Sequence, residues 1–176
     1  LAVWAAVSGV VMALAAAPPA TASPAGGSVA ASARAAVPDG VYGITFRGEE
    51  ESSLTQESDD PGSPTVLLPP LGEPGYQEWA LVRDSRTTQI IRNVRNGLYL
   101  GLNGGQPGDH RLVVVSANPF SWHVRTGSTP DRVTITVPGN VGYRLDRSPL
   151  LVHPPQVDIQ LPRNDGSQEW ELTPHE

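Results

Sequence analysis

Hydrophobic positions from residue 38 onward fall into short runs of β-branched and aromatic residues, which are cut by Gly, Pro, Asn and Asp. Runs of about four to eight such residues between turn formers predict β-strands. Beyond the apolar N-terminal stretch, no segment has the 3.6-residue period of an amphipathic helix. The pattern therefore predicts an all-β protein, with strands over residues 41–47, 53–57, 65–68, 78–83, 88–93, 98–102, 111–116, 121–125, 132–137, 142–147, 158–161 and 169–173.

Three tryptophans mark an internal repeat. Trp79, Trp122 and Trp170 recur at intervals of about 45 residues, and each closes a group of four predicted strands. Three equivalent groups of four strands predict a β-trefoil, in which six strands form a closed barrel and three hairpins cap one end. Closure removes the exposed sheet edges. The tryptophans are expected to fill the core rather than to contact a ligand, because large aromatic side chains act mainly through burial.

The N-terminal segment has a different character. Residues 1–17 are almost all apolar and are followed by Ala20-Thr21-Ala22, which fits a signal peptide over residues 1–22 and predicts a secreted protein. A membrane anchor is the alternative, but the run is slightly shorter than the roughly 20 residues of a spanning helix, and no basic cluster follows it. Residues 23–37 are low-complexity sequence that predicts a disordered leader. Residues 38–176 then form one domain.

Charge and cysteine content exclude several classes of protein. The net charge is −6, and the basic residues, all arginine, are scattered along the chain without a cluster, so nucleic acid is not an expected partner. The chain has no cysteine. Disulfides and a lipid-modified cysteine are therefore excluded, and a secreted domain of this kind depends on its core for stability. A monomer without a stable membrane anchor is expected.

Catalytic and metal-binding patterns are missing from the sequence. The four histidines, His110, His123, His153 and His175, match no metal-ligand spacing, and no nucleophile or phosphate-binding motif is present. The acidic residues at 49–51 and 59–60 lack the ordered oxygen spacing of a calcium loop and indicate solvated loops. We therefore expect no cofactor, no metal and no enzyme activity.

Four short motifs spread over the folded region carry a resemblance to a known family. They are DGVYGI at residues 39–44, QEW at 77–79, NGLYLG at 96–101 and QEWEL at 168–172. In these motifs the chain resembles the fungal β-trefoil serine protease inhibitors of the cospin type, which are related to the mycocypins, and their bacterial relatives. The resemblance implies an inhibitor that inserts an exposed loop into the active-site cleft of a serine peptidase, or of a cysteine peptidase.

The resemblance also implies where a reactive loop would lie. In cospin-like inhibitors the serine-protease loop joins the second and third strands, which here maps to Ser58, Asp59, Asp60, Pro61 and Gly62 and the two residues after them. This loop is acidic and contains no arginine. A trypsin-like pocket has an aspartate at its floor and would repel it, so this loop would need a different target.

Two further loops are candidates. Arg147 and Ser148 offer a basic residue followed by a small one, with prolines beyond, and Arg147 could enter a trypsin-like pocket; alternatively, Arg147 ends a strand in solvent. Arg95 and Asn96 precede Gly97 between the fifth and sixth strands. Mycocypin relatives place an asparagine there against asparagine-specific cysteine proteases, whereas Asn-Gly is also a preferred hairpin turn.

A ricin-B-like carbohydrate-binding module is the alternative function. The Gln-x-Trp pattern at residues 77–79 and 168–170 resembles the repeat of those lectins. Their sugar sites need an aspartate near the second strand of each unit, yet residues 97–102 contain no acid, and Phe120-Ser121 replaces the glutamine of the second unit. Asp146 with Tyr143 is the only candidate for a remnant of such a site. Multivalent sugar binding is not expected, and one weak site is left open.

Overall fold

The computed structural model describes residues 36–48 and 51–175, with the backbone alone for residue 51. All described residues belong to one compact unit. The predicted strands and the all-β class are confirmed, with ends that shift by one or two residues and no helix in the described ranges. The strands are β1 (Gly40–Arg47), β2 (Glu51–Thr55), β3 (Val66–Leu68), β4 (Glu78–Arg83), β5 (Gln89–Asn93), β6 (Tyr99–Leu102), β7 (Arg111–Ser116), β8 (Ser121–Thr126), β9 (Arg132–Thr136), β10 (Arg144–Arg147), β11 (Val157–Gln160) and β12 (Trp170–His175).

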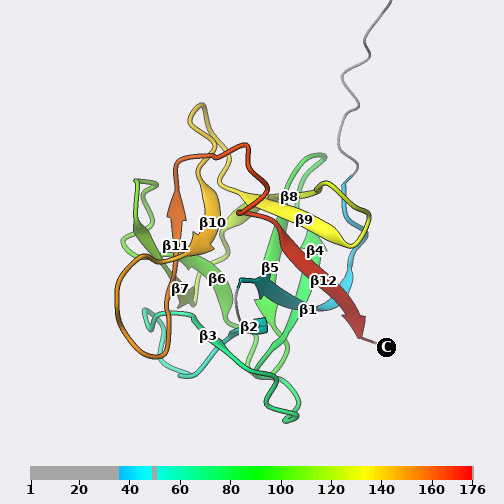
Figure 1. The fold of residues 1–176 in the computed structure, drawn as a ribbon. Helices are drawn as coiled ribbons and strands as arrows, with labels where there is room; N and C mark the ends of the chain where they lie inside the picture. The colour runs from blue at the N-terminus through cyan, green and yellow to red at the C-terminus, as the bar shows by residue number, and fades with distance from the viewer. Residues whose placement is uncertain (1–35, 49–50, 176) are drawn as a thin grey trace, which may run out of the picture. The chain divides into compact units, whose positions relative to one another are not determined.

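Six strands close into a barrel. Antiparallel pairing runs from β1 to β4, β5, β8, β9 and β12, and β12 returns to β1 with Ile44 opposite Leu172. Figure 1 shows β12 beside β1, where the last strand closes the ring against the first. Because each of these strands has a partner on both sides, the barrel has no free edge to template aggregation.

The other six strands form three hairpins, β2–β3, β6–β7 and β10–β11. The hairpins also contact one another. Asp158 of β11 pairs with Leu112 of β7, Val66 bridges to Gln156, and Pro64 bridges to Val114. The result is a three-part cap on the barrel, and barrel and cap together are the β-trefoil that the repeat predicts.

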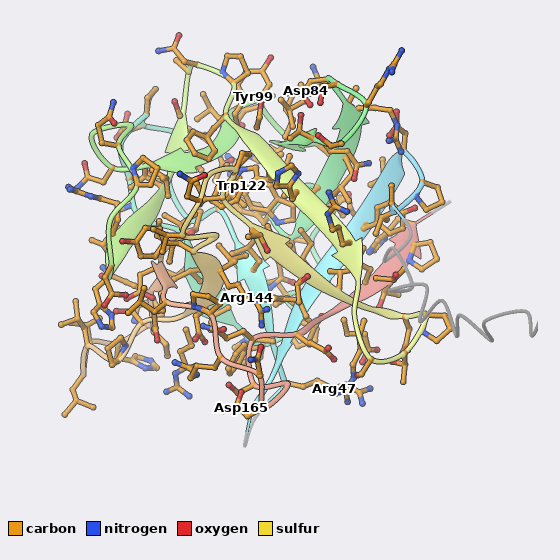
Figure 2. All side chains as sticks on the ribbon, turned by 90° about the horizontal axis from the view of Figure 1, so that it is seen from above. Arg47, Asp84, Tyr99, Trp122, Arg144 and Asp165 are labelled. Atoms are coloured by element: carbon orange, nitrogen blue, oxygen red, sulfur yellow. The ribbon has the colours of Figure 1, made fainter. Side chains whose placement is uncertain are left out.

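The three tryptophans occupy equivalent places in the core. Trp79, Trp122 and Trp170 are fully buried, and Figure 2 shows Trp122 among interior side chains while Asp84 and Asp165 lie at the rim. Each indole Nε1 donates to the carbonyl of a buried leucine on the second strand of its own unit. The distances are 2.9 Å to Leu54, 2.9 Å to Leu100 and 3.0 Å to Leu145. Each unit therefore ties its last strand to its own hairpin.

The described chain begins just before the predicted domain boundary. Val37, which the sequence places in the leader, is buried in the core, and Ala36 bridges to Arg125. The predicted signal peptide over 1–22, and the predicted leader up to residue 35, lie outside the described residues. No helix in the described part of the chain is long and apolar enough to cross a membrane.

Candidate binding loops

Three loops of the cap are equivalent by pseudo-symmetry. They join the strands of the three hairpins, and they span residues 56–65, 103–110 and 148–156. Their chemistry differs: the first is acidic, the second is rich in glycine, and the third contains Leu150, Leu151 and Val152 between prolines. The same scaffold position therefore presents three different surfaces.

The first loop ends in a compact turn. The Ser63 amide donates to the Asp60 carbonyl at 3.1 Å, with Pro61 and Gly62 between them. Gly62 has a φ of +95°, which with proline before it matches a type II β-turn. The Gly62 amide also donates to the Val115 carbonyl of β7 at 2.7 Å. Asp60, Pro61 and Gly62 are exposed, but their backbone is folded into a turn that is tied to the cap.

Asp59 joins two of the predicted loops. One of its carboxylate oxygens accepts from the Asn96 side-chain amide at 2.9 Å, and the other lies 3.1 Å from the Arg95 guanidinium. The Arg95 guanidinium also lies 4.1 Å from the centre of the Tyr76 ring. The structure thus brings the loop at 58–62 and the loop at 95–97 together into one exposed, cross-linked edge.

Asn96 also meets the requirements of a hairpin turn. Its side-chain oxygen accepts from the Leu98 amide at 3.1 Å, and Gly97 has a φ of +77°. Both ends of the Asn96 side-chain amide are therefore occupied within the chain. This arrangement fits the turn interpretation of Asn96-Gly97.

Arg147 and Ser148 lie at the base of the third loop. The Arg147 amide donates to Asp146 Oδ1 at 2.8 Å, and its carbonyl accepts from Gln160 Nε2 at 2.9 Å. The Ser148 amide donates to the Gln156 carbonyl at 2.9 Å, and Ser148 is buried. The Arg147–Ser148 peptide is therefore fixed within the sheet, although the Arg147 side chain reaches solvent.

Beyond Ser148 the chain leaves the body of the protein. Figure 1 shows this segment as the wide orange loop between β10 and β11. Three successive apolar residues are exposed at its tip: Leu150 at 55%, Leu151 at 104% and Val152 at 44%. We call residues 149–154 the apolar tip. The prediction for this loop rested on Arg147 and did not include the tip, although three consecutive apolar residues between prolines, outside any predicted strand, were a usable signal.

A hollow lies between the two ends of the third loop and the body of the protein. The hollow has a volume of about 430 Å³, with Arg147, His153 and Pro155 on the loop side and Phe46 and Leu67 among the residues of the body. The far end of the loop is fixed, because the Leu67 amide donates to the Pro155 carbonyl at 2.8 Å. The loop is therefore anchored at both ends and projects between them.

The predicted sugar-site remnant is occupied by the protein's own side chains. Asp146 Oδ2 accepts from Gln168 Nε2 at 3.0 Å and forms an ion pair with Arg163. Burial raises the pKa of the Asp146 carboxyl, and the bonds from Gln168 and Arg163 offset part of that increase. With both carboxylate oxygens engaged, Asp146 has little capacity left for a sugar hydroxyl.

The equivalent positions in the other units hold no acid. Gln77 Nε2 donates to Thr55 Oγ1 at 2.9 Å, which repeats the Gln168–Asp146 contact with a hydroxyl in place of the carboxylate. In the second unit a Cβ at Gly101 would lie 3.8 Å from the Cβ of Phe120. The two positions thus lie close together in all three units, and the residues there change from polar in the first and third units to Gly101 and Phe120 in the second.

Histidines and acids form pairs rather than metal sites. His110 Nδ1 lies 3.1 Å from Asp158 Oδ2, and His175 Nδ1 lies 3.6 Å from Glu78 Oε1. Among the described residues no group of three or more His, Asp or Glu side chains is arranged to hold a metal ion. The side chains of the acidic run at 49–51 lie outside the part of the chain that the structure describes.

Comparison with known proteins supports the fold. No protein-family model matches the chain, and no curated protein matches its sequence. The designed three-fold symmetric protein ThreeFoil is 17% identical with a TM-score of 0.68, over 78% of this chain and 100% of its own. The Macrolepiota procera ricin B-like lectin, solved in complex with lactose, is 22% identical with a TM-score of 0.67, over 80% and 100%. The Rhizoctonia solani agglutinin is 16% identical with a TM-score of 0.66, over 81% and 100%. At these identities the likeness shows the β-trefoil fold alone.

Proposed function

We propose that this chain is a protein inhibitor of a peptidase, and that the apolar tip at residues 149–154 is the segment that enters the active-site cleft. One observation carries the proposal. Within the described part of the chain, the backbone of these residues makes one hydrogen bond, from the Leu150 amide to Ser148 Oγ at 3.4 Å. Its other donors and acceptors are free to pair with a cleft, as an extended peptide does when its main chain provides affinity and its side chains provide specificity.

The anchoring of the loop supports tight binding. Buried Ser148 at one end and Pro155 at the other are hydrogen-bonded to the body, and prolines at 149, 154 and 155 restrict the backbone between. A loop that is already ordered loses less conformational entropy when it binds. The proposal assigns no catalytic step to this chain, and it includes export and a monomeric inhibitor, as the sequence predicts.

A panel of peptidases tests the proposal. The full chain is titrated against trypsin, chymotrypsin, subtilisin, papain and legumain, and residual activity is measured. In a variant, residues 149–154 are replaced by Gly and Ser at equal length. A matched control carries the same replacement at residues 103–108, in the equivalent loop of the second unit. We expect the first replacement to abolish inhibition and the second to leave it unchanged. Inhibition that survives the first replacement would show that the peptidase contacts another part of the surface. The edge formed by the loops at 58–62 and 95–97, which Asp59 joins, would be the next region to mutate.

Carbohydrate binding is the second candidate function. It is favoured by a hollow of about 530 Å³ beside Gly101, which is lined by Asn103, Asn118 and Phe120 among others. An aromatic ring with neighbouring amides suits a sugar, and two of the similar structures above are named as a lectin and an agglutinin. A glycan array distinguishes the two candidates. Binding to one glycan class that is lost in Asn118→Ala, together with no inhibition of any peptidase, would favour the sugar site.

A further inference from the structure

We propose that Leu151 determines specificity: its side chain fills the primary pocket of the target, which is a serine peptidase that prefers large apolar residues. This inference rests on the proposed function and narrows it to one residue and one class of partner. The sequence alone offered Arg147 as a residue that could enter a primary pocket, and the structure favours Leu151 for that role.

Exposure selects Leu151 among the three apolar residues. Its exposed fraction of 104% equals that of a residue with no neighbours, while Leu150 and Val152 are each about half covered. A leucine in that position loses no contact with its own protein when a partner buries it, so the full hydrophobic gain goes to the complex. Leu150 and Val152 would then contact the walls of the cleft on either side.

Arg147 is a poor choice for the same role because of its backbone. Its amide donates to Asp146, its carbonyl accepts from Gln160, and it pairs with Val157 across the hairpin. A residue that enters a primary pocket needs these groups for the cleft. Releasing them would break the base of the loop, so Arg147 is expected to stay at the rim of the complex.

The shape and charge of the tip indicate which partner it fits. A single fully exposed side chain on a projecting loop is complementary to a narrow, deep pocket, and residues 148–156 contain no acid. The Arg147 guanidinium lies at the base of the tip and reaches solvent, so a cleft with an acidic rim would be favoured. A lipid surface is a less suitable partner. The chain carries a net charge of −6, which an anionic membrane surface repels, and three exposed apolar residues on this loop are a small area for insertion into lipid.

Substitution of Leu151 tests the inference by a switch of target. The full-length wild type, Leu151→Ala, Leu151→Asp and Leu151→Arg are each titrated against chymotrypsin, subtilisin and trypsin. The matched control is Leu71→Ala, at an exposed leucine in another loop. We expect the wild type to inhibit chymotrypsin or subtilisin but not trypsin. Leu151→Asp should weaken that inhibition by about 30-fold or more, as loss of a binding hot spot does, and Leu151→Arg should acquire inhibition of trypsin.

The outcomes separate the inference from the proposed function. If the wild type inhibits a peptidase and all Leu151 variants stay within about threefold of it, the inference is wrong and the inhibitor function stands. If the wild type inhibits no peptidase of either panel, both are wrong. Two other results in place of inhibition would also overturn the inference. Binding of the wild type to phosphatidylserine vesicles would identify a lipid surface as the partner, and dimerisation that is lost in Leu151→Asp would identify a second copy of this chain. Because Leu151 has no neighbours to lose, its substitution should leave the unfolding midpoint unchanged, which separates lost binding from lost folding.

Discussion

Substitution of each core tryptophan by phenylalanine should destabilise the protein by similar amounts. Trp79, Trp122 and Trp170 are fully buried, and each donates one hydrogen bond to a leucine carbonyl. Trp→Phe keeps an aromatic ring but removes the donor, and an unpaired buried carbonyl costs about 1–3 kcal/mol. The smaller ring also leaves a gap that costs about 1–2 kcal/mol. The sum is about 2–5 kcal/mol, a large share of the roughly 5–15 kcal/mol typical of a domain.

Urea unfolding followed by far-ultraviolet circular dichroism measures this cost without a tryptophan signal. The three variants should lose stability with unchanged denaturant dependence. Leu71→Ala, at an exposed position, is the control and should stay within about 0.5 kcal/mol of the wild type. If one tryptophan substitution costs less than about 1 kcal/mol, its hydrogen bond does not contribute as the geometry indicates, and the equivalence of the three units is refuted.

Three further predictions concern the loops. Gly75→Ala should cost about 1–3 kcal/mol of stability, because Gly75 has a φ of +92° and a Cβ there would lie 2.8 Å from Arg95 Cβ. The control Gly72→Ala, at a φ of +71° with no atom within 4 Å of the added Cβ, should cost less. Equal urea midpoints for the two variants would contradict the clash at Gly75. Desolvation raises the pKa of Asp84, but hydrogen bonds from Ser121 and Thr88 outweigh this effect and hold the pKa below its ordinary value. The stability that the Asp84 carboxylate adds is therefore present above about pH 4 and is lost as the pH falls through the lowered pKa. In urea titrations from about pH 6 to pH 2, Asp84→Asn should therefore lose less stability on acidification than the wild type, and parallel curves would oppose this assignment. Asp59→Ala should speed hydrogen exchange of the Leu98 amide by freeing Asn96, with a stability change below about 1 kcal/mol, whereas Asp60→Ala should not; equal exchange in the two variants would show that Asp59 does not hold the loop.

The fold was predictable because its signals are local and repeated. Each strand is a short β-branched run between turn formers, and Trp79, Trp122 and Trp170 give the three-fold period. The contacts that set loop geometry are not local. Asp59 meets Asn96, which lies 37 residues away, and the pattern of either segment contains nothing that specifies this pairing.

The candidate site was predictable in place but not in detail. Arg147 and Ser148 pointed to the third hairpin loop, yet hydrogen bonds hold the backbone of both residues in the base of that loop. Which residue of a loop is exposed depends on where the flanking strands stop pairing and on what the loop packs against. The sequence indicates approximately where the strands end, but it does not indicate what the loop packs against. The prolines around residues 150–152 indicated a loop, but the sequence did not distinguish Leu151 from its two apolar neighbours.

The pairing of β1 with β12 has a consequence for how this module can be connected. Val41 lies opposite His175 in the ladder, so the first and last strands enter and leave the domain side by side. A domain with neighbouring ends can be inserted as a guest into a surface loop of a host protein without stretching either chain. It can also be circularly permuted by a short linker, with new ends at residues 103–108. In either arrangement the third hairpin loop is left uncut, so a host protein that carries this domain would present the apolar tip on its surface.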